Sequence, residues 1–305
     1  MRKFMLVLMP FFIVCSTAVA KEFPNYLTSK MIKNIATEET EETEETEETE
    51  EAIPSPIYVD KEKLMSLFLS HGRIIIAGKD RTEEIADRFL IWIGNHQEIL
   101  DENRLESVIA KAAYVCKLDR RTNICEHVFV LADEMDSYAK THPNGRFAGN
   151  WQRACRVIGA ESCHKYWAKN RISTAAGLWQ FLDSTCNWFG ANQIRIIARE
   201  LERSGDAALP RIGGLHKMLW ATNQSEVYGL MRPHPGHGNS LPGLNAPRSR
   251  QFQRLFEQNR SDGVSDEEAF IQSVEDVIRF QVNIGCRLLD SHGWSQWEVC
   301  TRYGF

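Results

Sequence analysis

Residues 156–190 read RVIGAESCHKYWAKNRISTAAGLWQFLDSTCNWFG, and this stretch organises the second half of the chain. Apolar residues repeat at helical spacing over Trp151–Ala160, a range that begins five residues before this stretch and continues into it. This repeat predicts a buried helix that ends at Glu161. A turn of small residues follows and contains Gly177–Gln180, of sequence GLWQ. Asp183 then precedes a serine and a threonine, which predicts that its side chain caps a further helix.

Glu161 has the setting that a general acid requires. A glycosidic oxygen must be protonated near neutral pH, so the donor carboxyl needs a raised pKa. A glutamate at the end of an apolar helix, with Trp167, Trp179 and Trp188 nearby in sequence, is a candidate for such a desolvated carboxyl. Most glutamates point to water. The sixteen-residue spacing from Glu161 to Gly177 favours the functional interpretation here.

A lone acid beside Ser162, followed by the GLWQ turn and by Thr185, resembles the core of the soluble lytic transglycosylase family. Members of that family are lysozyme-like enzymes that cut the glycan strands of bacterial peptidoglycan. The resemblance implies a mainly α fold, with a lysozyme-like transglycosylase domain over residues 148–305. It is sharpest over residues 161–185, and the chain end looks more like divergent phage-tail or secretion-associated members.

The resemblance also implies a one-acid mechanism for cleaving the MurNAc-β-1,4-GlcNAc bond. Glu161 would first donate a proton to the leaving oxygen. It would then accept one from the C6 hydroxyl of N-acetylmuramic acid, which closes a 1,6-anhydro ring. Such a mechanism needs no metal and no cofactor.

Ser173, Thr174 and Gln180 match positions that line the cleft beside the acid in the family, and Trp179 and Tyr303 are two further candidate substrate contacts. Ser173 or Thr174 would orient the carboxyl, and Gln180 would hydrogen-bond an N-acetyl sugar. Trp179 fits core packing and sugar stacking equally well. The family's Ala-Tyr-Asn-Ala-Gly segment is absent here, and its nearest equivalent is Arg302–Gly304. Tyr303 is therefore a candidate substrate contact, with packing as a C-terminal aromatic as its equal alternative.

Three other interpretations stay open. Ordinary glycosidases use two carboxylates, and Asp183 is the nearby acid that would make the chain a muramidase that hydrolyses the same bond with water. A different register of the family motif, starting from residues 108–119, would make Glu134 the acid. The chain could instead be a non-catalytic glycan-binding or assembly protein of a cell-envelope machine.

The N-terminus has the pattern of a signal peptide over residues 1–20. Arg2 and Lys3 precede the apolar run Phe4–Val14, and Ala18–Ala20 forms a small-residue cleavage site. The apolar run is too short to span a bilayer comfortably, so no stable membrane span is expected after cleavage. The protein is therefore predicted to be exported to the periplasm, the cell envelope or the exterior, an oxidising environment.

Residues 21–56 are predicted to be a disordered acidic linker. Thr37–Glu51 repeats TEE and holds ten glutamates with no base and no apolar residue. The formal net charge of -5 comes from this tract, and the rest of the mature chain is slightly basic. That balance suits a polymer such as peptidoglycan but is too weak for nucleic acid. The linker also motivates an envelope secretion machine as a partner.

Residues 57–147 are predicted to form a helical accessory region. Asp60, Thr82 and Asp101 stand where N-caps are expected, and Ile74–Ile76 fits a short strand or a buried turn. Residues 232–250 are predicted to be a long loop. Helices are predicted at Lys61–Leu69, Thr82–Ile93, Glu102–Cys116, Glu126–Lys140, Gln193–Leu201 and Asp266–Leu289.

Seven cysteines follow the leader, so at least one has no partner within the chain. Export predicts disulfides, and Cys116–Cys125 and Cys286–Cys300 are the pairs closest in sequence; the partner of Cys163 is left open between Cys155 and Cys186. His234 and His237 have a spacing that can bind a metal ion, but two histidines in a Pro/Gly-rich loop without a third ligand are more typical of solvated side chains.

Overall fold

The computed structural model describes residues 59–94, 96, 102–118, 127–236, 240–261 and 263–303, without the side chains of residues 102, 210, 211, 213 and 301–303. The chain divides into two units, Met1–Ile53 and Pro54–Phe305, and all described residues belong to the second. The predicted signal peptide, the acidic repeat, Asp101, Cys125 and His237 lie outside the described residues.

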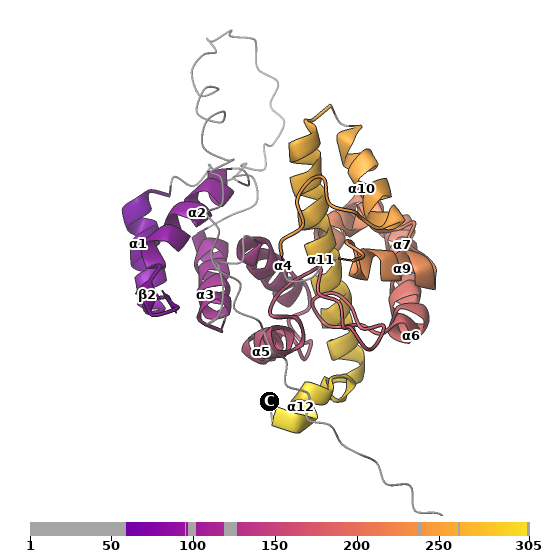
Figure 1. Ribbon diagram of the computed structural model, residues 1–305, viewed down its shortest axis with the longest axis horizontal. Helices are drawn as coiled ribbons and strands as arrows, with labels where there is room; N and C mark the ends of the chain where they lie inside the picture. Colours follow the sequence, from indigo (N-terminus) through magenta and orange to yellow (C-terminus); the bar gives the residue numbers. More distant parts are fainter. Residues whose placement is uncertain are drawn as a thin grey trace, which may run out of the picture. The chain divides into compact units, whose positions relative to one another are not determined.

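The Pro54–Phe305 unit is mainly α-helical, as predicted (Figure 1). The strands of its described part form a single antiparallel hairpin, β1 (Ile75–Ile76) and β2 (Lys79–Asp80), with Ile75 opposite Asp80. For Ile74–Ile76 the sequence predicted either a short strand or a buried turn, and the structure has the short strand.

The four helices predicted in the first part of this unit are present. They are α1 (Lys61–Ser70), α2 (Thr82–Gly94), α3 (Glu102–Leu118) and α4 (Val128–Thr141). Asp60 caps α1 as predicted, because its carboxylate accepts a hydrogen bond from the Lys63 N–H at 2.6 Å. The predicted cap at Thr82 is wrong. Its hydroxyl instead accepts from the Ile74 N–H at 2.9 Å and donates to Asp80, which ties the hairpin to α2.

The second part of the unit contains the predicted helix before Glu161, now α5 (Trp151–Ser162), and the long helix α11 (Asp266–His292). Residues 232–249 form the predicted loop around the undescribed residues 237–239. The remaining elements are η3 (Ala148–Asn150), α6 (Asp183–Thr185), η4 (Cys186–Gly190), α7 (Ala191–Ser204), η5 (Gly205–Ala208), α8 (Leu209–Ile212), η6 (Gly213–Met218), α9 (Gln224–Met231), α10 (Arg250–Arg260), η7 (Trp294–Gln296) and α12 (Glu298–Tyr303).

Asp183 is not a helix cap, contrary to the prediction. The N-cap position of α6 is Leu182, and Asp183 is the first helical residue. Its own backbone N–H donates to the Thr174 hydroxyl at 3.1 Å. The Asp183 carboxylate is therefore not used to satisfy the helix end.

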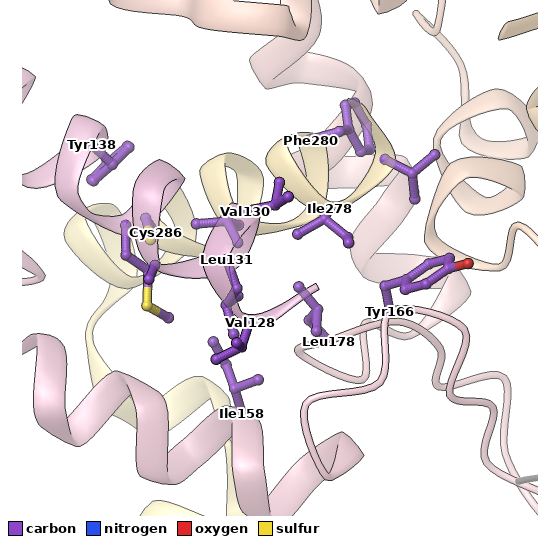
Figure 2. Packing of buried hydrophobic residues seen from close by; sticks show 14 of the residues in the cluster. Val128, Val130, Leu131, Tyr138, Ile158, Tyr166, Leu178, Ile278, Phe280 and Cys286 are labelled. Atoms are coloured by element: carbon purple, nitrogen blue, oxygen red, sulfur yellow. The ribbon is translucent and has the colours of Figure 1, made fainter. Parts of the chain in front are cut away.

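The core forms around α11, which packs along α4 (Figure 1). Figure 2 shows Val128, Val130 and Leu131 on α4 close to Ile278 and Cys286 on α11. Ile158 of α5 and Leu178 lie against the same cluster. A helix with apolar residues on nearly every side is expected at the centre of a core, and α11 has that pattern from Val274 onward.

Buried charges join α3, α4 and α11. Asp133 on α4 accepts hydrogen bonds from Arg104 and Arg279, each at 2.6 Å. Glu134 lies 3.7 Å from Arg279 and accepts a hydrogen bond from the Asn283 amide at 3.3 Å. Buried charges are tolerated when they are paired and hydrogen-bonded in this way. The helices α3 and α4 therefore pack directly on α5 and α11 of the predicted catalytic part, within one compact unit.

Among the described residues, Cys155, Cys186, Cys286 and Cys300 carry free thiols. Cys286 lies in the core beside Cys155, and burial raises its pKa. A disulfide between Cys286 and Cys300 is not formed, and disulfide bonding of this chain stays a prediction. Within the described ranges, no helix combines the length and the apolar composition needed to cross a bilayer.

Candidate functional site

The end of α5 places Glu161 at the edge of the core. Cys163 and His164 both adopt left-handed backbone conformations, with φ of 53° and 59°, which stop the helix and reverse the chain. The buried His164 ring then folds back over Gly159, where an added Cβ would lie 2.8 Å from the ring. This tight reversal holds the last turn of α5, and with it Glu161, in one orientation.

The Glu161 carboxyl has a strongly raised pKa, of about 7. Burial is the main cause, and the negative charge of Glu298 on α12 adds to it. None of the described residues forms a hydrogen bond or an ion pair with this carboxyl, so no fixed cation holds it ionised. The side chain is only partly buried, so it remains reachable from solvent. It can therefore both donate and accept a proton near neutral pH.

The helix α12 forms one wall beside Glu161. Cys300 on α12 lies near both Glu161 and Arg153, and the Arg153 guanidinium sits 4.2 Å from the centre of the Trp294 ring. The predicted contact residue Tyr303 is the last residue of α12, but its side chain lies outside the described residues. Its role in substrate contact stays a prediction.

A second glutamate with a raised pKa, Glu134, occupies a different kind of environment. Burial raises its pKa to about 7, but only 5% of the residue is exposed, and its carboxylate is held by Asn283 and by the charge of Arg279. A substrate cannot reach such a side chain without opening the core. Of these two candidates for the acid, Glu161 is the accessible one.

The GLWQ turn closes a small hairpin after Glu161. Ala176 pairs with both Lys169 and Phe181 in the manner of antiparallel strands. Gly177 has φ of +78°, and a Cβ there would lie 2.8 Å from the Gln281 side chain, so the turn needs a glycine. The Gln180 amide donates to the carbonyls of Ala168 and Gly177, at 3.3 and 2.9 Å. Gln180 thus stabilises the turn through these two hydrogen bonds. Its hydrogen bond to an N-acetyl sugar stays a prediction.

Gln281 holds this turn against α11 and is a site residue that sequence reasoning missed. Its carbonyl oxygen accepts from the Leu178 N–H at 2.8 Å. Its amide donates to the Tyr166 and Leu230 carbonyls at 3.0 and 2.9 Å, and the residue is completely buried. The available signal was a lone glutamine in the apolar run of residues 277–284, VIRFQVNI, because a buried amide must have partners.

Trp179 belongs to the core, which is one of its two predicted roles. Its side chain is 1% exposed and its rings lie 5.0 Å from those of Trp297. It also lies against Gly285 of α11, where an added Cβ would come within 2.1 Å of the indole nitrogen. Sugar stacking on Trp179 would need this packing to be broken.

Ser173 and Thr174 lie exposed on the loop of the hairpin. The Ser173 hydroxyl accepts from the Ala175 N–H at 3.2 Å, and the Thr174 hydroxyl accepts from Asp183. Among the described residues neither hydroxyl bonds to Glu161. Their predicted role in orienting the carboxyl therefore stays a prediction.

A cavity of about 660 Å³ lies beside this loop and α9. Thr174 and Asp183 line it, together with Tyr228, Arg232 and Gln251. Glu161 does not line it, and Figure 1 shows α5 and α6 on different sides of the lower part of α11. The structure thus brings Thr174 and Asp183 together but does not place Asp183 in a pair with Glu161.

His234 is buried, contrary to the expectation that it is solvated. It is 1% exposed, packs against Phe252 and approaches the Pro247 carbonyl at 3.3 Å. In the part of the chain that the structure describes, no group of three or more His, Cys, Asp or Glu side chains is arranged to hold a metal ion.

Comparison with protein-family models, with curated proteins and with solved structures found no match to this chain.

Proposed function

We propose that this chain is a peptidoglycan lytic transglycosylase with a lysozyme-like catalytic domain, in which Glu161 is the single general acid/base. The observation that carries the proposal is the state of the Glu161 carboxyl. It stands at the end of α5, it is partly exposed, it has no ionic partner among the described residues, and burial raises its pKa to about 7. The predicted leader is consistent with export to the compartment that contains peptidoglycan.

The proposed reaction uses this carboxyl twice. Protonated Glu161 donates its proton to the glycosidic oxygen as the bond from C1 of N-acetylmuramic acid to that oxygen breaks. The resulting carboxylate takes the proton of the C6 hydroxyl, whose oxygen bonds to C1 and closes the 1,6-anhydro ring. The carboxyl is then protonated again, so that no water is consumed and no proton is lost. A pKa near 7 suits both steps, because neither protonation state is strongly preferred.

The muramidase alternative has less support. A retaining or inverting hydrolase needs a second carboxylate across the scissile bond. Asp183 lines the cavity beside α9, whereas Glu161 does not, and the electrostatic neighbour of Glu161 is Glu298. Glu298 raises the pKa of Glu161, which keeps this carboxyl available as a proton donor near neutral pH.

Mass spectrometry of the sugars released from purified peptidoglycan tests the proposal. The wild-type protein is expected to release products one water lighter than simple hydrolysis products, because the 1,6-anhydro ring replaces an added water. Hydrated reducing ends would instead identify a muramidase. If a folded wild-type protein released no sugars, the chain would be a glycan-binding or assembly protein.

The pH dependence of cleavage should report the Glu161 environment. The protonated form starts the reaction, so kcat/KM is expected to fall as the pH rises through about 7. Glu298→Gln removes a nearby negative charge and should lower the pKa of Glu161, which moves this alkaline limb to lower pH. The matched control is Glu83→Gln on α2, where the exposed carboxylate pairs with Lys61. An alkaline limb at the same pH in wild type and Glu298→Gln would contradict the assignment.

A further inference from the structure

The cavity beside α9 is lined by side chains that include two opposite charges. Asp183 comes from α6, Tyr228 from α9, and Gln251 from the first turn of α10; Arg232 follows α9 directly. Its volume, about 660 Å³, is in the range of small-ligand sites. Glu161 is not among its lining residues, so this cavity is separate from the proposed acid.

Arg232 lines the cavity, and its guanidinium has no partner among the described residues. It forms no ion pair or side-chain hydrogen bond with any described residue, and its Nε atom is buried without a partner. A buried donor without an acceptor is costly, and it is more costly when it is charged. A guanidinium in this state is suited to bind a carboxylate, for which its planar donors match both oxygens.

Asp183 supplies the opposite charge. Its carboxylate also forms no hydrogen bond or ion pair with the described residues, and no ion pair joins it to Arg232. Two unpaired opposite charges in one cavity are complementary to a ligand that carries both an ammonium and a carboxylate. A neutral N-acetyl sugar would leave both charges unpaired, so it fits this lining less well.

The neutral groups of the lining favour a peptide-like ligand. The Gln251 side-chain amide has no hydrogen-bond partner among the described residues and can pair with a peptide group. The Tyr228 hydroxyl donates to the Thr174 carbonyl at 2.9 Å, which leaves its oxygen able to accept a hydrogen bond.

We infer that this cavity binds a zwitterionic amino-acid centre of a peptidoglycan stem peptide, with its carboxylate on Arg232 and its ammonium on Asp183. The choice of stem peptide as the source rests on the proposed function. A diamino-dicarboxylic residue, such as meso-diaminopimelate, provides this group at the end of its side chain. A lysine in the same position provides the ammonium without the carboxylate.

Calorimetric titration of the full mature chain tests the inference. The probes are the tripeptide L-alanyl-γ-D-glutamyl-meso-diaminopimelate, the corresponding L-lysine tripeptide and free diaminopimelate. The diaminopimelate tripeptide is expected to bind at least about tenfold more tightly than the lysine tripeptide, because it adds a charge-assisted bond to Arg232. Binding of free diaminopimelate with the same affinity would show that the site takes the amino acid itself, and would overturn the stem peptide as its ligand.

Arg232→Gln is expected to remove this preference and to weaken diaminopimelate tripeptide binding at least about tenfold, while Arg232→Lys should keep part of it. The matched control is Arg199→Gln, an exposed arginine on α7 that does not line the cavity. Thermal melting checks that each variant is folded. Equal binding of the two tripeptides, or unchanged binding by folded Arg232→Gln, would overturn the inference.

Cleavage of peptide-free glycan strands by the wild-type protein, measured in parallel, separates this inference from the proposed function. Cleavage without peptide binding would leave the transglycosylase standing and overturn the peptide site. Peptide binding without cleavage would keep the peptide site and overturn the proposed enzyme.

Discussion

Glu161→Gln is expected to lower the rate of anhydro-sugar release by about a thousandfold, since acid–base catalysis contributes roughly 10²- to 10⁴-fold and both proton transfers use this carboxyl. An amide has nearly the same shape, but it neither donates to the leaving oxygen nor accepts the C6 hydroxyl proton. The loss should therefore appear in kcat, with little change in KM.

The fold of the Glu161→Gln variant should be intact. The folded-state pKa of Glu161 is raised above its ordinary value of 4.5, so ionisation opposes folding as the pH rises from that value through about 7. A neutral glutamine avoids this cost. The variant is therefore expected to melt at the same or a higher temperature than wild type at pH 8.

Glu134→Gln is the most informative comparison for this experiment. Glu134 also has a pKa of about 7, so its neutral form is already well populated and glutamine imitates it. Because Glu134 is buried and bound by Asn283, this substitution should keep turnover. Loss of turnover in a folded Glu134→Gln, with turnover retained in Glu161→Gln, would place the acid on α4 and contradict the proposed site.

Gln281→Leu is expected to cause the largest loss of stability, about 4 kcal/mol, because each buried polar group left without a partner costs about 1–3 kcal/mol. Leucine fills a similar volume but leaves the Leu178 N–H and the carbonyls of Tyr166 and Leu230 without the Gln281 amide. The GLWQ turn would lose its attachment to α11, so turnover should also fall at temperatures at which the variant is still folded.

Denaturant unfolding followed by circular dichroism measures this effect. The matched control is Gln272→Leu, a partly buried glutamine earlier on α11 that forms no side-chain hydrogen bond with the described residues. Its free energy of unfolding should change by less than about 0.5 kcal/mol. Equal, small changes in the two variants would show that Gln281 does not anchor the turn.

Most helices of the described unit could be predicted from the sequence. Their apolar residues recur at spacings of three and four, and that pattern lies within a single segment of chain. The same local pattern placed Glu161 at the end of α5. The cap on α1 was also predictable, because Asp60 and the N–H that it binds are three residues apart.

The sequence did not decide whether Trp179 packs in the core or stacks on a sugar. It also did not predict that Gln281 holds the GLWQ turn, that His234 is buried, or that a cavity lies beside α9. Each depends on contacts between distant segments: Gln281 bonds to Leu178 across 103 residues, and the Trp297 indole bonds to Trp179 across 118. The sequence by itself determined the helical pattern and the position of Glu161 at the end of α5, because both arise from neighbours along the chain. The tertiary structure decided which side chains are buried and which charges share the cavity beside α9, because those depend on segments that meet only when α11 packs into the core.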